Sequence, residues 1–248
     1  MDDATDLSLP ADLYNFKECT SIFSMINTLN IASMTSTTFQ KCISNFQRFL
    51  STFPWLYVYW DKYATFVWSG KGDLDLVRKI YFEALSKKCL FYSVDMWICC
   101  IKFFRTNLTQ TEQDEMRNIF ALSLDAVGSH FNSAELWRLA INFESENHRS
   151  VFPLLAKSIT YPTSELKHFW AELQLLFPKV SLQYFQAFID NKDKSVTELL
   201  QLFLTIPINA IQIATSIDMS STENENSEEI QLRSNYISIL TDFYNSSL

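Results

Sequence analysis

Apolar residues recur at steps of three and four through most of the chain, which is the spacing of one face of an α-helix. The pattern predicts a succession of helices separated by short polar breaks. The expected helices cover about residues 13–29, 38–52, 55–68, 74–88, 94–105, 112–126, 134–146, 149–159, 180–190, 195–205 and 228–244, with one more around Trp170 that ends near Pro178.

Turn and cap residues mark the ends of several of these helices. The stretch Gly70-Lys71-Gly72 is predicted to form a turn, and Asp73 to cap the helix that follows it. Ser133 is expected to cap the helix that begins at 134. Thr111 and Asp114 have the spacing of a variant capping box.

Tryptophan recurs along the chain in the same local context. Trp60, Trp97 and Trp137 are 37 and 40 residues apart, and Trp170 follows 33 residues later. Each of the first three is followed by apolar residues on the same helical face, as Tyr63 follows Trp60. A recurrence at 35–40 residues is typical of stacked helical pairs. The sequence therefore predicts an all-α fold, a right-handed α-solenoid of helical hairpins.

The second helix of each predicted pair carries a repeat of its own. Arg78, Tyr81 and Ala84 stand three residues apart, and Arg117 and Phe120 repeat the beginning of that spacing. A small residue lets the neighbouring helix come close, and an aromatic ring fills the groove beside it. This pattern predicts packing positions.

The repeats divide the chain into five regions. Residues 1–52 are predicted to form an N-terminal helical pair, 53–178 the repeat core, 179–217 further helices, 218–229 an acidic flexible loop, and 230–248 a C-terminal helix.

Composition narrows the classes of function. The net charge of −8 disfavours a nonspecific nucleic-acid surface, because phosphate binding needs clustered Lys and Arg. The five cysteines include no C-x-x-C pair and lie in apolar helical contexts, so we expect reduced, buried thiols in an intracellular protein. The acidic N-terminus has no apolar run, and no stretch is long and apolar enough to span a bilayer.

Residues that could carry chemistry are scattered. No glycine-rich phosphate loop or nucleophile motif occurs, and the three histidines lie far apart. Cys99-Cys100 fits core packing better than a metal site. Glu144 and Glu146 fit a solvated helix face better than an acid–base pair. We therefore predict no catalytic, cofactor-binding or metal-binding residue. The basic spot at Lys87-Lys88 is expected to be a solvated helix side, although contact with RNA or an acidic partner stays open.

The two-helix unit, with Trp and Tyr or Phe in its first helix and Arg-x-x-Tyr/Phe-x-x-Ala-Leu in its second, resembles the half-a-tetratricopeptide (HAT) repeat. The segment 126–144 is similar to the Gly-x-x-Phe-x-Ser-x-x-Leu-Trp junction of the pre-mRNA-processing factor 39 and 42 family. Its matching positions are Gly128, Phe131, Ser133, Leu136 and Trp137, and the segment continues through Phe143. The resemblance covers about residues 40–175. Ala140 stands where the family usually has an aromatic residue.

This resemblance implies a non-catalytic scaffold in the nucleus. The expected function is support of 5′ splice-site recognition in the U1 small nuclear ribonucleoprotein (U1 snRNP) through protein contacts. The implied partners are U1 snRNP proteins and other splicing factors, a related HAT-repeat protein in a homo- or heterodimer, and U1 RNA mainly indirectly, without a membrane. The chain is much shorter than family members, so we expect an N-terminal half or a reduced homologue. A scaffold of mRNA 3′-end processing, a direct RNA-binding module and a helical enzyme stay open as alternatives.

Overall fold

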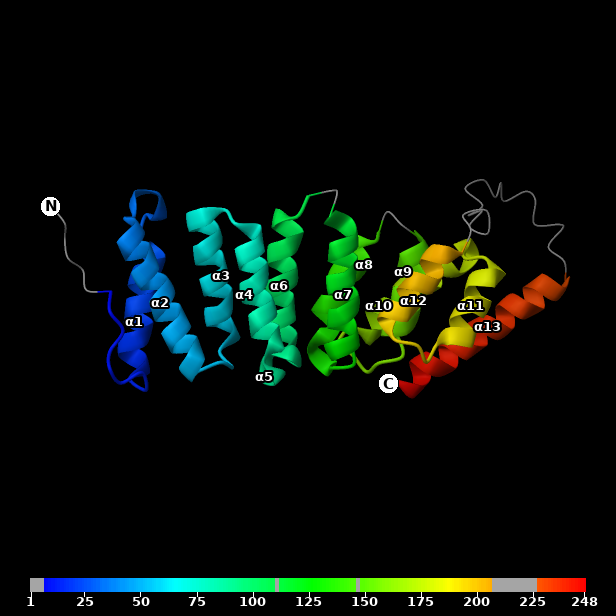
Figure 1. Cartoon of the computed structure of the whole chain (residues 1–248). Coiled ribbons are helices and arrows are strands. Elements are labelled where there is room, and N and C mark those ends of the chain that lie inside the picture. Colours follow the sequence, from blue (N-terminus) through cyan, green and yellow to red (C-terminus); the bar gives the residue numbers. More distant parts are fainter. Residues whose placement is uncertain (1–6, 110–111, 146–147, 207–226) are drawn as a thin grey trace. The chain divides into compact units, whose positions relative to one another are not determined.

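A computed structural model describes residues 7–109, 112–145, 148–206 and 227–248 (Figure 1). Helices joined by short connections make up these ranges, and no strand occurs in them, so the predicted all-α fold is confirmed. The chain divides into two compact units, Met1–Cys100 and Ile101–Leu248, and the division falls inside helix α6.

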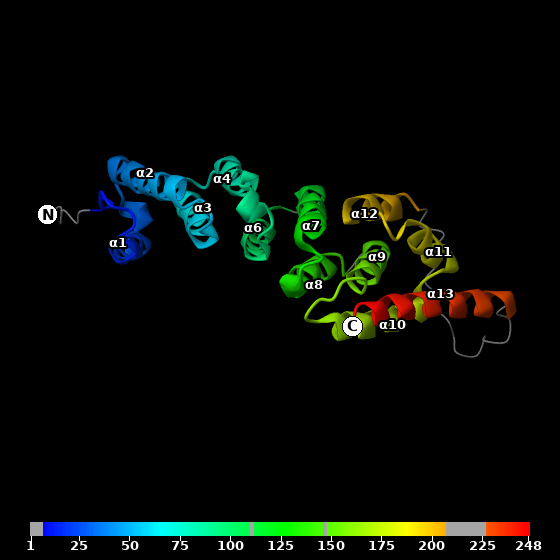
Figure 2. The same ribbon diagram turned by 90° about the horizontal axis from the view of Figure 1, so that it is seen from below.

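The first unit is built from helices that pack as neighbours in chain order. They are α1 (Phe16–Thr28), α2 (Ser36–Thr52), α3 (Tyr57–Lys71), α4 (Leu74–Ser86), the short α5 (Lys88–Phe91) and the first part of α6 (Val94–Asn107), with a 3₁₀ turn at Ile31–Ser33. Helix α3 packs against both α2 and α4. Figure 2 shows α2 and α4 on one side of this unit and α1 and α3 on the other.

Stacked aromatic rings form the core of the first unit. Phe46 from α2 is fully buried and stacks on Tyr63 of α3, with ring centroids 5.4 Å apart. Phe39 stacks on Phe66 in the same way at 4.9 Å. The helical spacing of these residues places them on the facing sides of α2 and α3. Rings at this separation stabilise the pair beyond the area that they bury.

The second unit begins with the same hairpin pattern and then departs from it. Its helices after α6 are α7 (Gln113–Val127), α8 (Ala134–Phe143), α9 (His148–Ser158), α10 (Leu166–Leu176), α11 (Leu182–Asn191), α12 (Val196–Thr205) and α13 (Ser227–Ser246), with 3₁₀ turns at Phe131–Ser133 and Phe177–Lys179. Helix α12 packs on α9 and also on α7, which lies far from it in the sequence.

One carboxylate connects α7 to α12. The side chain of Asp125 in α7 accepts hydrogen bonds from the backbone N–H groups of Val196 and Thr197, at 2.5 and 3.2 Å, and from the Thr197 hydroxyl. These N–H groups open α12 and have no partner within the helix. Ser195 and Glu198 complete the cap as a capping box.

Several boundaries and caps differ from those predicted. Helix α3 continues through Lys71, so the turn is made by Gly72 alone, at a φ of 60° that glycine adopts without strain. The helix predicted over 74–88 ends at Ser86 and is followed by α5, which the pattern did not predict. The helix predicted to reach 146 ends at Phe143. Thr111 lies outside the described residues.

The acidic segment is described only in part. Residues 227–229 of the predicted 218–229 loop belong to α13, which begins at Ser227, and the rest of that prediction lies outside the described residues. Helix α13 packs on α11, where Tyr236 stacks on Phe185 with ring centroids 5.8 Å apart. Arg233 donates hydrogen bonds to the carbonyls of Phe177 and Val180 and so fastens α13 to the end of α10.

Candidate functional site

The repeat tryptophans Trp60, Trp97 and Trp137 each donate an indole hydrogen bond to a backbone carbonyl that precedes their own helix. The indole N–H of Trp60 donates to the Pro54 carbonyl at 2.9 Å, and that of Trp97 donates to the Phe91 carbonyl at 2.8 Å. Both acceptors lie six residues earlier, just before the helix that carries the tryptophan. All three rings are buried, and the Trp137 indole N–H donates to a carbonyl nine residues earlier. Each ring therefore anchors its own helix to the connection that precedes it.

Trp170 occupies a different environment. Its ring is half-buried and stacks on Tyr244 of α13, with centroids 4.9 Å apart and planes 12° from parallel. Phe169 beside it is fully buried, as is Leu173 of the same helix. No indole hydrogen bond of Trp170 occurs within the described ranges. Trp170 thus lies on a helix as predicted, but it contacts the C-terminal helix.

Gly128 is the centre of the junction between α7 and α8. Its carbonyl accepts from the Trp137 indole at 2.9 Å and from the Ser133 hydroxyl at 2.7 Å. A Cβ on residue 128 would lie 2.3 Å from the Leu124 carbonyl oxygen and 3.1 Å from Cζ2 of Trp137, so no larger residue fits there. Ser133 stands at the N-cap position of α8 as predicted, but its hydroxyl makes no capping bond and serves this junction instead.

The repeated arginines form ion pairs on their own helices. Arg78 pairs with Asp75, and Arg117 pairs with Asp114 at 3.0 Å, in each case three residues earlier. The sequence reading missed this aspartate three residues before each arginine, although it belongs to the same repeat. The Tyr81 hydroxyl donates to Asp61 in α3 at 2.7 Å. Burial, together with the Asp61 charge, raises the pKa of Tyr81 above its ordinary value.

The remaining repeat positions are small or aromatic and lie in the core, apart from Phe143, which is half-buried. Ala84 and Ser123, which take the same position in α4 and α7, are fully buried. Phe120 is buried and its ring lies 5.3 Å from that of Phe143. These positions hold the helices together and carry no reactive group.

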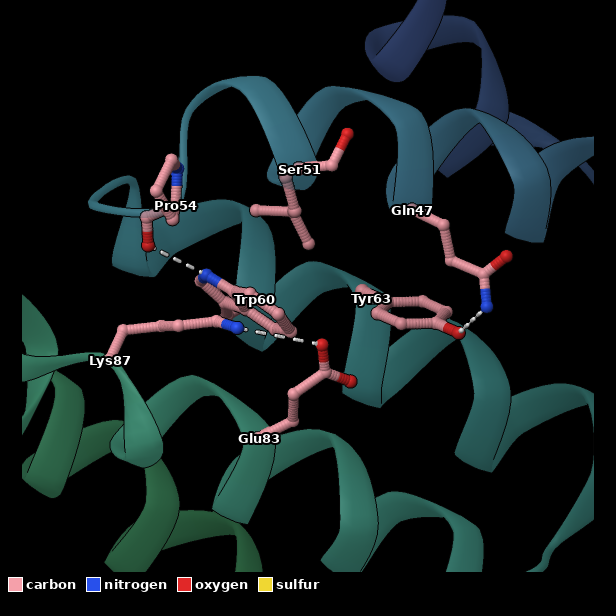
Figure 3. Close-up of a pocket in the computed structure, with 8 residues that line it drawn as sticks. Gln47, Ser51, Pro54, Trp60, Tyr63, Glu83 and Lys87 are labelled. Carbon is pink, nitrogen blue, oxygen red and sulfur yellow. Dashed lines mark hydrogen bonds and ion pairs between the residues drawn. The ribbon is translucent and has the colours of Figure 1, made fainter.

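A groove of about 490 Å³ crosses the first unit between α2 and α4 (Figure 3). Its lining comes from α2, α3, α4 and their connections and consists of Gln47, Leu50, Ser51, Pro54, Trp60, Tyr63, Glu83 and Lys87. The Gln47 amide donates to the Tyr63 hydroxyl at 3.2 Å. Lys87 and Glu83 form an exposed ion pair at 3.9 Å. Burial raises the pKa of Tyr63 and keeps its hydroxyl protonated.

The groove is suited to recognition rather than to chemistry. It presents apolar side chains, one amide, two hydroxyls and one charge of each sign. It holds no nucleophile beside a base and no pair of acids that could share a proton. No sequence motif predicts this groove, because Gln47 lies in α2, whereas Glu83 and Lys87 lie in and directly after α4.

The potentially reactive side chains are dispersed. No group of three or more metal-ligating residues occurs in the part of the chain that the structure describes. Burial raises the pKa of the Cys19, Cys42 and Cys100 thiols, which keeps them protonated and unreactive. Cys89 was predicted to be buried, but it is exposed in α5. Among the described residues, no helix is both long and apolar enough to cross a membrane.

Glu144 corrects another prediction. It was expected to lie on a solvated face, yet it is 4 % exposed and accepts from Arg117 Nε at 2.7 Å. Burial acts to lower the pKa of Arg117, but the hydrogen bonds and charges of Glu144 and Asp114 together outweigh it, and the pKa is raised. The pair is a structural contact between α7 and the end of α8.

Comparison with known proteins assigns these repeats to a family. Residues 8–175 match the family model described as the PRP39 N-terminal HAT repeat. The match begins earlier than the predicted resemblance over 40–175 and so includes both α1 and α2. It ends within α10, at the point where the hairpin pattern gives way to α11, α12 and α13.

Curated relatives agree with this match. The chain is 30 % identical to pre-mRNA-processing factor 39 of Mus musculus over 128 residues, which cover 50 % of this chain and 19 % of that protein. It is also 30 % identical to pre-mRNA-processing factor 39 of Homo sapiens over 128 residues, which again cover 50 % of this chain and 19 % of that protein. The protein of that name from Schizosaccharomyces pombe is 30 % identical over 131 residues, 51 % of this chain and 20 % of that one. The matched region thus spans about a fifth of the relatives' length. With its all-α solenoid of helical hairpins, the chain belongs to the PRP39 N-terminal HAT repeat family.

Proposed function

We propose that the chain is a non-catalytic scaffold of pre-mRNA splicing that acts in the nucleus as part of the U1 snRNP. The observation that carries the proposal is the family match over residues 8–175, which includes every helix from α1 to most of α10. The relatives' name, pre-mRNA-processing factor, supports the process. Within the U1 snRNP, the scaffold would support 5′ splice-site recognition through protein contacts.

The site geometry supports a binding role. The repeat positions are occupied by packing and hydrogen bonds, and the α2–α4 groove offers mixed polar and apolar contacts that suit a protein segment. The net charge of −8 makes protein contact more favourable than direct contact with phosphates. The proposed partners are U1 snRNP proteins and other splicing factors, with a related HAT-repeat protein as a dimer partner.

Affinity purification tests the proposal directly. The tagged chain of 248 residues would be recovered from nuclear extract, with proteins identified by mass spectrometry and RNA by sequencing. The expected result is enrichment of U1 RNA and its core proteins. Recovery of 3′-end cleavage factors without U1 RNA would overturn the splicing assignment. Tight binding of the purified chain to RNA alone, at about 0.15 M salt, would overturn a purely protein-mediated role.

A charge reversal in the groove tests which surface is used. Lys87→Glu places two negative charges one helical turn apart, at Glu83 and residue 87, and should weaken recovery of the partner. Lys79→Glu is the matched control, because Lys79 is an exposed residue of α4 outside the groove. Equal recovery with both variants would remove the groove from the proposal and leave the scaffold role standing.

A further inference from the structure

Three aromatic side chains are exposed together at one end of the first helical pair. Tyr14 is 74 % exposed, Phe16 41 % and Trp55 55 %. Their rings surround the buried ring of Phe53, with centroid distances of 5.4, 4.8 and 5.7 Å. Phe16 is the first residue of α1, Tyr14 lies just before that helix, and Trp55 follows the end of α2. We call these three residues the aromatic patch.

The backbone beneath the patch is held firmly. Arg48 of α2 donates to the carbonyls of Leu9, Pro10 and Ala11 at 3.0–3.4 Å. The Asn45 amide donates to the Leu7 carbonyl. These bonds fix the segment that leads into Tyr14, while Phe53 supports all three rings from below. The patch is therefore a fixed surface, and burial in the core does not account for its rings.

The patch carries two hydrogen-bond donors. The Trp55 indole N–H and the Tyr14 hydroxyl have no partner within the described part of the chain. A Trp or Tyr at such a surface presents an apolar ring and a donor that can reach a backbone carbonyl. Proline-rich segments offer the complement: extended polyproline II backbone, rigid rings and carbonyls without competing N–H groups.

Charge argues against single-stranded nucleic acid as the occupant of the patch, and area argues against a second copy of the chain. Single-stranded nucleic acid stacks on aromatic rings but also needs a basic groove for its phosphates. The Arg48 guanidinium, which lies beneath the patch, is already bonded to three carbonyls. A second copy of the chain would need roughly 800 Å² per partner for a stable dimer, whereas three half-exposed rings offer a few hundred.

We propose that the aromatic patch binds a proline-rich, extended segment of a partner protein. This inference goes beyond the proposed function and stands on the patch alone, so it holds whichever assembly the chain joins. It also differs from the groove of Figure 3, which lies on α2, α3 and α4 and presents a charged pair.

Fluorescence anisotropy of the full chain with a labelled ten-residue oligoproline tests the proposal. A Gly-Ser peptide of equal length and an oligouridine serve as comparison probes. Trp55→Ala should weaken oligoproline binding at least about tenfold, as expected for an aromatic anchor. Trp55→Phe, which keeps a ring and loses the donor, should fall in between. Tyr92→Ala is the control, because Tyr92 is 59 % exposed in the same unit and outside the patch.

Four outcomes would overturn the proposal. The first is failure of the wild-type chain to bind oligoproline better than the Gly-Ser peptide, and the second is a loss of oligoproline affinity with Tyr92→Ala that equals the loss with Trp55→Ala. The third is oligouridine binding that depends on Trp55. The fourth is a dimer, seen by sedimentation velocity, that Trp55→Ala dissociates. Because Trp55 is exposed, its variants should fold, and circular dichroism with a thermal scan verifies this. Failure of the wild-type chain to bind oligoproline, together with intact U1 snRNP recovery, would reject this inference alone.

Discussion

Arg117 and Glu144 form an ion pair with one buried partner, joined at 2.7 Å between Nε and Oε1. Arg117 is the repeat arginine of α7 and Glu144 is the residue after α8, so the pair closes that hairpin at its open end. The second oxygen of Glu144 is buried and has no hydrogen-bond partner within the described chain, which leaves the carboxylate dependent on Arg117.

Removing the arginine should therefore be costly. Arg117→Ala leaves a buried charge unpaired, and we expect a loss of about 2–4 kcal/mol in the free energy of unfolding, measured by urea denaturation. Lys102→Ala is the control. Its partner Glu135 and Lys102 itself are both more than half exposed, so the loss should stay below about 1 kcal/mol. Similar losses from both variants would contradict a special role for the buried pair.

Gly128→Ala should destabilise the second unit. The added Cβ would collide with the Leu124 carbonyl and press on the Trp137 ring, which forces the junction to shift. We expect a loss of about 1–3 kcal/mol, seen as a lower denaturation midpoint. Ser129→Ala changes the exposed neighbour and should stay within about 0.5 kcal/mol of wild type. An unchanged midpoint for Gly128→Ala would mean that the junction adapts.

The stability lost on replacing a tryptophan should depend on how deeply its ring is buried. Trp97→Ala removes a ring that is 3 % exposed and should cost roughly 3–5 kcal/mol. Trp97→Phe keeps most of the volume but leaves the Phe91 carbonyl without its donor, at a cost of about 1–2 kcal/mol. Trp170→Ala removes a half-buried ring that stacks on Tyr244 and meets Phe177 edge-on, and it should cost less than about 2 kcal/mol. The same denaturation series measures all three, and a negligible loss for Trp97→Ala would place its ring outside the core.

Stability should fall at alkaline pH. The pKa of Tyr81 is raised in the folded chain, so above pH 10, the ordinary value, the unfolded chain loses this proton first. The contribution of Tyr81 is fully present below pH 10 and decreases as pH rises toward its folded pKa. Tyr81→Phe should cost about 1 kcal/mol at pH 7, through the lost bond to Asp61, and should make the decline above pH 10 shallower. A parallel pH profile for the variant would assign the decline to other groups.

Local spacing was sufficient to predict much of this fold. The helices around Trp60, Trp97 and Trp137 follow from apolar periodicity, because each ring packs against the connection directly before its own helix. The Gly128 junction was recognised from its pattern, whereas the reason for it, a carbonyl shared by Ser133 and Trp137, needed the coordinates.

Distant contacts could not be predicted in this way. Glu144 reads as a surface residue because its partner lies 27 residues away. Trp170 fits the tryptophan spacing, yet Tyr244 of α13 determines its environment. The aromatic patch could not be predicted for another reason, which concerns exposure rather than distant contacts. Apolar residues are usually assigned to a core, and no periodicity reveals that Tyr14 and Trp55 stay exposed.

The bond network of Asp125 affects how the second unit can come apart. Repeat arrays with only nearest-neighbour contacts lose their terminal helices one after another. Here α12 is tied to α7 across 71 residues, so fraying of the C-terminal part must also break contacts near the start of the unit. The region from α7 to α12 should therefore resist stepwise proteolytic trimming and open in a single transition, whereas a simple ladder of hairpins would yield a series of shorter fragments.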